Sequence, residues 1–359
     1  MCGPIDYIAL SLLPVWRWRV IAERLRAGDS PTDILLAQCA DGVRRRRGAP
    51  TWVSPDWTRD QARRKLEHAQ ASGVRPVLQS ETSYPRHLLE IVDPPPVLWV
   101  SGRTAALSVT AVAIVGSRAG STYALSVAER LSADLAAHGI CVVSGLARGV
   151  DSAAHRGALS VGGVTVGVLG CGVDVAYPPE NVALMADIKV AGAIVSELAP
   201  GTAPRPGFFP RRNRIISCLV RAVVIVEAGE KSGSLITARC ALEQGRDVLA
   251  VPGNVLTGRN KGGHALLRDG ARVVESAADV LDELGLQPVG RGRTVAGQPE
   301  DRVLAALTAG ESSNLDEIST RTGLSVVELL PRLLELELQD ELSREPGGRF
   351  LRRVRNVLG

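Results

Sequence analysis

The stretch Ala113-Ile114-Val115-Gly116-Ser117-Arg118 decides the fold, because a short apolar run leads directly into a loop of small and polar residues. Between Val97 and about Leu284, apolar runs of strand length alternate with helical segments, which is typical of a parallel α/β sheet. In such a sheet the loops that follow the strands lie at the carboxyl edge, where ligands bind. Three further stretches repeat the pattern: Cys141 to Gly149, Val166 to Gly172, and Val223 to Glu227 followed by Lys231-Ser232-Gly233-Ser234.

These loops have the composition of an anion-binding site. Gly and Ser bring backbone N–H groups close to an anion, and Arg and Lys supply the opposite charge. Several such loops around one crevice favour a polyanion over a single nucleotide. Arg118 stands where a dinucleotide fingerprint needs its second glycine, which argues against an NAD enzyme. Lys231-Ser232 resembles the end of a Walker A motif, but Glu230 replaces the required glycine and makes an ATPase unlikely.

Two helix starts lie beside these loops. Asp151 is expected to be the N-cap of a helix over Ser152 to Leu159. Pro210 can begin a second helix, in which Arg211 and Arg214 share a face and Arg212 lies about 100° away.

The start of this second helix, Phe209-Pro210-Arg211-Arg212-Asn213-Arg214, predicts a phosphate-binding surface. Arginine guanidinium groups match phosphate oxygens in a bidentate way. Phe209 is one of three phenylalanines in the chain and could stack on an unpaired base, a contact worth about 1–3 kcal/mol.

The composition is that of an ordinary globular protein. With 359 residues the chain is long enough for two or three domains, and its net charge of only +4 means that a nucleic-acid surface must be local. The six cysteines show no paired metal spacing and are expected to be buried, reduced thiols of a cytoplasmic protein without a metal or other cofactor. No apolar run approaches the roughly 20 residues of a membrane span.

The proline- and glycine-rich breaks in the chain predict three domains and a linker. Residues 1–75 form a helical N-terminal (SAM-like) domain, residues 76–284 the sheet domain, residues 285–299 a Gly- and Pro-rich linker, and residues 300–359 a winged-helix domain. The third helix of this last domain, Val326 to Leu338, lies in an acidic segment, since residues 311–341 hold eight acids against two arginines. We therefore expect the domain to contact protein rather than DNA.

The sheet domain carries six motifs in unbroken order: Gly116-Ser117-Arg118, Ser144 to His155, Gly170-Cys171-Gly172, Tyr177 to Asn181, Phe209 to Arg214, and Ser232 to Ala238. Together these motifs make the chain resemble the DprA (Smf) family, the DNA-processing protein A. The resemblance implies an α/β fold with an extended Rossmann-like parallel-sheet domain, single-stranded DNA binding, and self-association. It also implies loading of the RecA recombinase during natural transformation, in competence.

A DNA pocket follows from the loops and this resemblance together. Arg118, Lys231 and the segment from Arg211 to Arg214 would bind the backbone, and Phe209 would contact a base. For the homodimer we expect an apolar patch that includes Leu266 and Leu267, although both could equally be core residues. The predicted DNA-binding residues are Gly116, Ser117, Arg118, Ser144, Gly145, Arg148, Phe209, Arg211, Arg212, Asn213, Arg214, Lys231, Ser232, Gly233 and Ser234.

Two other functions stay open. A superfamily with similar loops cleaves nucleoside monophosphates, but its Pro-Gly-Gly-x-Gly-Thr loop is replaced here by residues 230–234. Cys171 as a nucleophile would need His155 to approach it in space. No catalytic residue is therefore assigned, and a nucleotide- or RNA-binding module is the third alternative.

Overall fold

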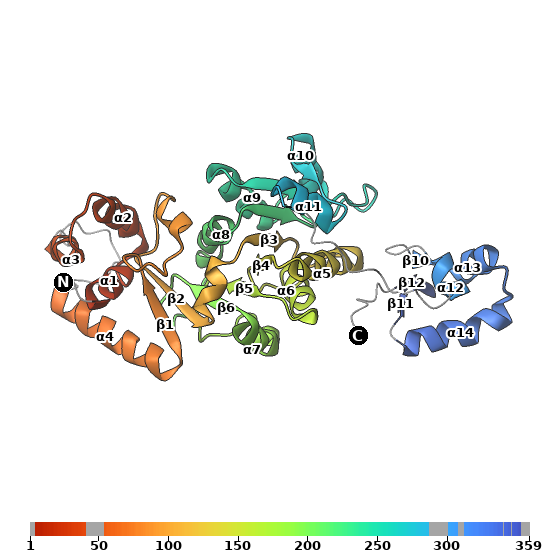
Figure 1. The fold of residues 1–359 in the computed structure, drawn as a ribbon, viewed down its shortest axis with the longest axis horizontal. Helices are drawn as coiled ribbons and strands as arrows, with labels where there is room; N and C mark the ends of the chain where they lie inside the picture. Colours follow the sequence, from red (N-terminus) through yellow and green to blue (C-terminus); the bar gives the residue numbers. More distant parts are fainter. Residues whose placement is uncertain are drawn as a thin grey trace.

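The computed structural model describes residues 4–40, 54–286, 301–307, 312–339, 341–345 and 347–352. Its centre is a nine-stranded sheet with the order β1-β2-β6-β5-β4-β3-β7-β8-β9 (Figure 1). The strands are β1 (Val74–Leu78), β2 (Val97–Gly102), β3 (Ala111–Val115), β4 (Cys141–Ser144), β5 (Thr165–Val168), β6 (Ala193–Ser196), β7 (Ala222–Ile225), β8 (Asp247–Ala250) and β9 (Arg272–Val273).

The strands from β6 to β9 in this order are parallel, as the sequence predicts. The chain starts this region at β3, adds β4, β5 and β6 on one side, and then returns to place β7 on the other side of β3. The loops after β3 and β7 therefore meet at a topological switch point, where open α/β sheets bind their ligands. At the opposite end, β2 pairs antiparallel with β6, and β1 antiparallel with β2.

Alternation along β3 shows how helices cover both faces of the sheet. Val112 and Ile114 pack with α5, α6 and α11, whereas Ala113 and Val115 pack with α8 and α9. All four are at most 3% exposed, as expected for a strand buried on both faces. The helices are α5 (Thr122–Ala137), α6 (Val150–Ser160), α7 (Val182–Ala191), α8 (Phe208–Cys218), α9 (Ser234–Glu243), α10 (Lys261–Arg268) and α11 (Ala277–Glu283).

The N-terminal helices gather beside β1 and β2 (Figure 1). Ile8, Trp18 and Ile34 share a buried core with Trp99 of β2 and Met185 of α7. These helices are therefore continuous with the edge of the sheet, and the predicted boundary at residues 75–76 falls within β1. They are α1 (Pro4–Ser11), α2 (Trp18–Arg26), α3 (Pro31–Ala40) and α4 (Pro55–Ala71), and the 3-10 turns are η1 (Val15–Arg17), η2 (Arg86–Leu89), η3 (Thr104–Ser108) and η4 (Pro179–Asn181).

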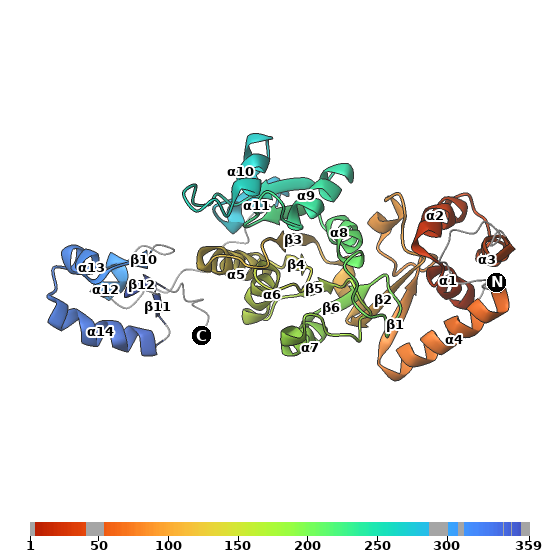
Figure 2. The ribbon, with the colours of Figure 1, turned by 180° about the vertical axis from the view of Figure 1, so that it is seen from behind.

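The C-terminal unit has the helices and hairpin that the sequence predicts (Figure 2). It also has its own apolar core. It comprises α12 (Arg302–Ala306), β10 (Ser312–Ser313), α13 (Leu315–Thr322), α14 (Val326–Leu338), β11 (Leu342–Glu345) and β12 (Arg349–Arg352). One face of α14 is buried, while Val327, Leu330, Leu334 and Leu338 on the other are 49–81% exposed. From residue 287 onward the predicted linker lies outside the described residues.

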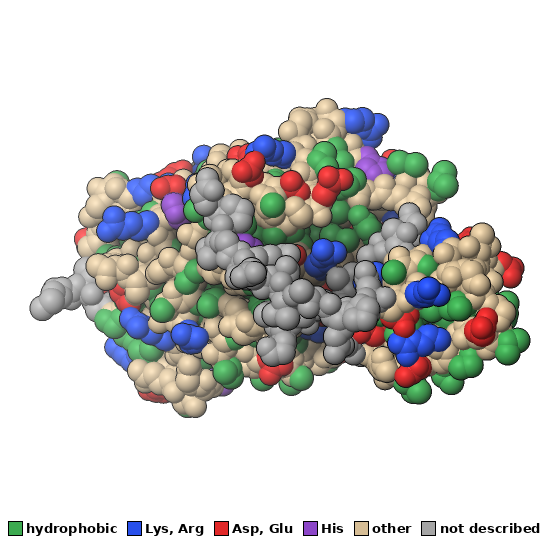
Figure 3. All heavy atoms as spheres, turned by 45° about the vertical axis from the view of Figure 1, so that its right-hand side comes forward, with side chains coloured by type: hydrophobic (Ala, Val, Ile, Leu, Met, Phe, Trp, Pro, Cys, Tyr) green, Lys and Arg blue, Asp and Glu red, His purple; other side chains and the backbone are tan. Residues whose placement is uncertain are grey.

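Charged side chains of both signs are interspersed over the face in Figure 3. This agrees with the small net charge of +4. Among the described residues, no helix is long and apolar enough to cross a membrane, and no three His, Cys, Asp or Glu side chains are grouped to hold a metal ion.

Candidate functional site

A cavity of about 770 Å³ opens at the switch point of the sheet. Its walls come from the loops after the parallel strands β3 to β7, from one face of α8 and from the start of α9, so residues far apart in sequence meet there as predicted. Its lining includes ten of the predicted site residues: Gly116, Ser117, Arg118, Phe209, Arg212, Asn213, Lys231, Ser232, Gly233 and Ser234.

Two cations of this cavity are available to a ligand. Arg118 and Lys231 are exposed, and neither forms an ion pair with an acid in the described parts of the chain. The Arg118 guanidinium lies 5.5 Å from the centre of the Phe209 ring, and the Tyr177 ring lies 5.3 Å from Phe209 on centroids. An aromatic pair with a cation above it offers both a stacking surface and a positive charge.

One face of α8 lines the cavity. Phe209, Arg212, Asn213 and Ile216 all contribute, and their i, i+3, i+4, i+7 spacing places them on one side of a helix. The Asn213 side chain donates to the carbonyl of Gly233, 3.2 Å away, and ties α8 to the start of α9. This bond fixes the two helix starts against each other.

Arg212 is a buried cation in the cavity wall. It is 4% exposed, and its Nη1 donates to the carbonyl of Val168 at 2.6 Å. Burial lowers the pKa of Arg212 to about 10, although the nearby Asp151 carboxylate raises it. The guanidinium therefore stays charged at neutral pH, and it lies against Gly145, where a side chain would collide with it.

The prediction that Asp151 is an N-cap is wrong. Helix α6 begins at Val150 with Gly149 as its N-cap, so Asp151 already lies in the first turn. Its carboxylate instead accepts from the backbone N–H groups of Gly145 (3.1 Å) and Ala147 (3.4 Å), which shapes the loop after β4. Burial raises the pKa of Asp151, while Arg212 and these N–H groups oppose the rise.

Arg211 and Arg214 do not line the cavity. They leave α8 on another face and pair with Glu197, which follows β6, and with Asp93 from the proline-rich segment. The Arg211 guanidinium also lies 4.3 Å above the ring of Trp18. Glu197 is 3% exposed, and burial raises its pKa even though both arginines lower it. Because their charges are already neutralised, we assign these two arginines to the attachment of α8.

Three further predicted residues also lie outside the cavity lining. Ser144 is fully buried, and its hydroxyl donates to the carbonyl of Ile114 at 2.6 Å. Gly145 lies behind Arg212. Arg148 is exposed but pairs with Glu180. The contacts of these three residues stabilise the loops, and none of the three lines the cavity where a ligand would bind.

The sequence prediction missed eleven of the lining residues, and Asp151 and Tyr177 are the two among them with an ionisable side chain. Tyr177 stands in the motif that carries the family resemblance, but nothing in the local sequence shows that its ring meets Phe209. Only the fold of the intervening segment brings these two rings together.

Cys171 and His155 each have other hydrogen-bond partners. The Cys171 thiol donates to the carbonyl of Val175 at 3.3 Å, and burial raises its pKa to about 11. Nδ1 of His155 is hydrogen bonded to Thr165 Oγ1 at 2.7 Å, and burial lowers the pKa of His155 to about 3. A protonated thiol and a histidine directed at Thr165 are not arranged as a nucleophile and its base.

The two leucines of the predicted dimer patch lie in different settings. Both are partly buried against the core, but only Leu267 lines an open hollow of about 680 Å³ beside α10. Val255 lines the same hollow and is 76% exposed, and its neighbour Leu256 is 90% exposed. Exposed apolar groups thus adjoin Leu267.

Curated relatives resemble the chain over most of its length. It is 40% identical over 276 residues to Protein Smf of Escherichia coli, covering 74% of each chain. It is 45% identical over 200 residues to the DNA processing protein DprA of Streptococcus pneumoniae, which covers 56% of this chain and 71% of the relative.

Solved structures share the fold. The X-ray structure of DprA from S. pneumoniae has a TM-score of 0.64 and 34% identity, covering 79% of this chain and 99% of that one. A DprA structure from Helicobacter pylori, described as giving insights into a single-stranded DNA binding mode, has a TM-score of 0.53 and 30% identity and covers 59% and 95%.

Family models match both parts of the chain. The model of DNA recombination-mediator protein A matches residues 75–285, and that of the DprA winged helix domain matches residues 294–348. Since the first match alone covers more than half of the 359 residues, the chain belongs to the DprA/Smf family.

Proposed function

We propose that the cavity at the switch point binds single-stranded DNA. The observation that carries this proposal is the juxtaposition of two exposed cations, Arg118 and Lys231, with the Phe209 ring in one cavity. Neither cation has an acidic ion-pair partner among the residues that the structure describes. The cations attract the phosphates, and the first turn of α9 adds backbone N–H groups. The Phe209 ring is a surface for an unstacked base.

The Phe209 ring beside the two cations favours a single strand over a duplex. In a duplex the faces of the bases are stacked inside the helix, so Phe209 could reach only groove edges and phosphates. A single strand offers a base face to the ring and its phosphates to Arg118 and Lys231 at the same time. Binding by stacking and charge requires little base identity.

We further propose a role as a recombination mediator in the cytoplasm. A homodimer, joined around Leu267, would present the bound strand to the RecA recombinase during natural transformation. The family description as a recombination-mediator protein supports the first part of this proposal. Binding rather than catalysis also agrees with the partners of Cys171 and His155.

We propose that the winged-helix unit contacts protein. Its α14 exposes Val327, Leu330, Leu334 and Leu338 next to acidic side chains such as Glu335. Acids would repel phosphate, and exposed leucines suit an apolar partner surface.

The direct test is fluorescence anisotropy of the full chain with labelled oligo-dT and with duplex of the same length, titrated against salt. The proposal predicts tighter binding of the single strand and a log–log salt slope of about −0.7 per phosphate contact. Equal affinity for duplex, or a slope near zero, would exclude the cavity as a single-strand site.

A further inference from the structure

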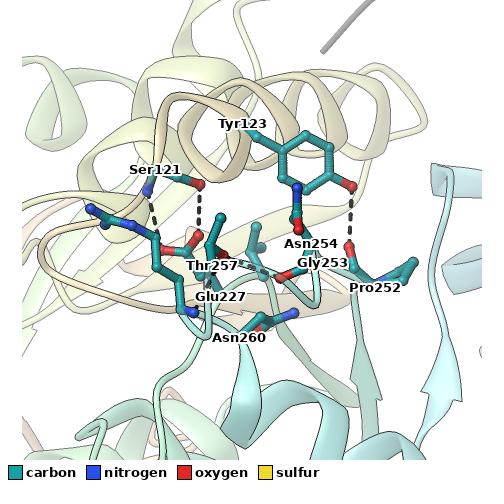
Figure 4. Close-up of a pocket in the computed structure, with 10 residues that line it drawn as sticks. Ser121, Tyr123, Glu227, Pro252, Gly253, Asn254, Thr257 and Asn260 are labelled. Carbon is teal, nitrogen blue, oxygen red and sulfur yellow. Dashed lines mark hydrogen bonds between the residues drawn. The ribbon is translucent and has the colours of Figure 1, made fainter. Parts of the chain in front are cut away.

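A second cavity, of about 490 Å³, opens at the same edge of the sheet (Figure 4). Its walls are the start of α5 with Ser121 and Tyr123, the end of β7 with Glu227, and the loop after β8 from Pro252 to Asn260. The volume lies within the range of small-ligand sites, roughly 300–1,000 Å³.

The two cavities are neighbours across the loop that follows β3. Ala119 of this loop lines the first cavity, and Arg259 of the second donates from Nη1 to the Ala119 carbonyl at 3.1 Å. The N–H of Ser117 donates to the carbonyl of Glu227 at 2.8 Å and closes the wall between them. A strand that leaves Arg118 can therefore reach the second cavity by crossing a single loop.

Tyr123 gives the second cavity an aromatic wall. The residue is 37% exposed, and its hydroxyl donates to the carbonyl of Pro252 at 3.1 Å (Figure 4). A ring that is held at its far end while its surface remains accessible loses little freedom when a base stacks on it.

Glu227 gives the cavity a buried acceptor. The residue is 6% exposed, and its two carboxylate oxygens accept from the Ser121 N–H (3.1 Å) and the Ser121 hydroxyl (2.6 Å). A carboxylate has about four lone-pair positions, so acceptor capacity remains for a ligand. A negative group repels phosphate, whereas it accepts well from an exocyclic amino group of a base.

Arg259 supplies the charge at the rim. It is exposed and forms no ion pair with any acid among residues 4–40, 54–286 and the described parts of the C-terminal unit. The second cavity thus combines a stacking ring, a buried acceptor and a cation at its mouth.

We propose that this second cavity is a nucleobase subsite. It takes one base of the strand held in the first cavity, stacked on Tyr123 with its N–H edge toward Glu227, while Arg259 contacts the adjoining phosphate. Guanine, cytosine and adenine carry an amino group that can donate to the carboxylate. Thymine has only its N3–H, which lies between two carbonyl oxygens that the carboxylate repels, so the subsite disfavours thymine. The inference rests on the proposed single-strand binding and adds a base preference at one position.

The first experiment compares Tyr123→Ala with Tyr123→Phe in binding a 12-nucleotide single strand. Loss of one stacked base corresponds to about a fivefold or larger loss of affinity. Tyr123→Phe retains the ring, and we expect it to bind within about twofold of the wild type. If Tyr123→Ala binds the strand as the wild type does, while Arg118→Ala weakens it, the subsite is wrong and the first cavity stands. If neither variant differs from the wild type, the proposed function itself fails.

The second experiment moves a single dG through an oligo-dT 12-mer. Binding should tighten at one position, and Glu227→Gln should abolish this gain, because the amide nitrogen presents donors to the base. If the wild type binds the 12-mer with the same affinity wherever dG stands, the proposed base preference is wrong. A titration with dGMP tests whether the base comes from a strand or from a free nucleotide. If dGMP binds tightly and Tyr123→Ala abolishes this binding but leaves the affinity for the 12-mer unchanged, the cavity is a free-nucleotide site and the proposal is wrong.

Discussion

The guanidinium of Arg212 occupies the space where a side chain at residue 145 would lie. A Cβ on Gly145 would overlap Arg212 Nη1 and lie 2.5 Å from its Cζ. Because Arg212 is buried and bonded to Val168, it cannot move aside without leaving a charge short of a partner.

Gly145→Ala is therefore expected to destabilise the protein by roughly 1–3 kcal/mol, through overpacking, and to weaken single-strand binding. Urea denaturation and anisotropy measure the two effects. Gly207→Ala is the stability control, since a Cβ at Gly207 meets no atom within 4 Å. Equal free energies of unfolding for the Gly145→Ala and Gly207→Ala variants would show that Arg212 moves aside without destabilising the protein.

Arg118→Ala and Lys231→Ala should each weaken binding to all single-stranded sequences and flatten the salt slope by about 0.7 per lost phosphate contact. Arg156→Ala on α6 is the matched control, because Arg156 is exposed but does not line the cavity. Unchanged affinity and slope in both cavity variants would place the strand elsewhere.

Removal of residues 300–359 should leave single-strand affinity within about threefold. The reason is that the outward face of α14 offers leucines and acids rather than cations. Anisotropy on the truncated chain measures this, and a tenfold loss would show that the C-terminal unit contributes to DNA binding.

If the proposed homodimer forms around Leu267, Leu267→Glu should convert it into a folded monomer, because a carboxylate would enter the apolar hollow that Leu267 shares with Val255. Light scattering reports the mass, and circular dichroism confirms folding. Leu242→Glu is the control, since Leu242 is 60% exposed on α9 and does not line the hollow. A Leu267→Glu variant that stays dimeric would move the interface away from α10.

Acid should destabilise the protein through His155. Burial lowers its folded-state pKa to about 3, whereas an unfolded histidine has a pKa of about 6.5. The stabilising contribution is therefore present above pH 6.5 and lost as the pH falls toward 3, by about 2 kcal/mol at pH 5.

Urea denaturation at pH 7 and pH 5 should show a smaller loss of unfolding free energy in His155→Gln than in the wild type. His87→Gln, at an exposed position, should keep the full loss. Equal losses in the wild type and His155→Gln would contradict this assignment.

The sequence predicted the parallel core well, because apolar runs that end in small residues reflect strands buried on both faces. It also predicted the faces of α8, since helical periodicity separates Arg211 and Arg214 from Arg212. It did not reveal which face meets the cavity. That choice depends on Asp93 and Glu197, acids more than ten residues away whose position is set by the sheet. The N-cap prediction for Asp151 was wrong for a similar reason. The start of α6 depends on the loop after β4, and the Asp151 carboxylate accepts a hydrogen bond from Gly145 of this loop.

Helix α8 connects the cavity with the N-terminal helices. It presents Arg212 to the cavity and Arg211 to the ring of Trp18 in the N-terminal helices. If occupancy of the cavity shifts α8, it changes the free energy with which the N-terminal helices attach to the sheet. By thermodynamic linkage, a protein that binds those helices would then change the affinity of the cavity for the strand by the same factor by which the strand changes the affinity for that protein.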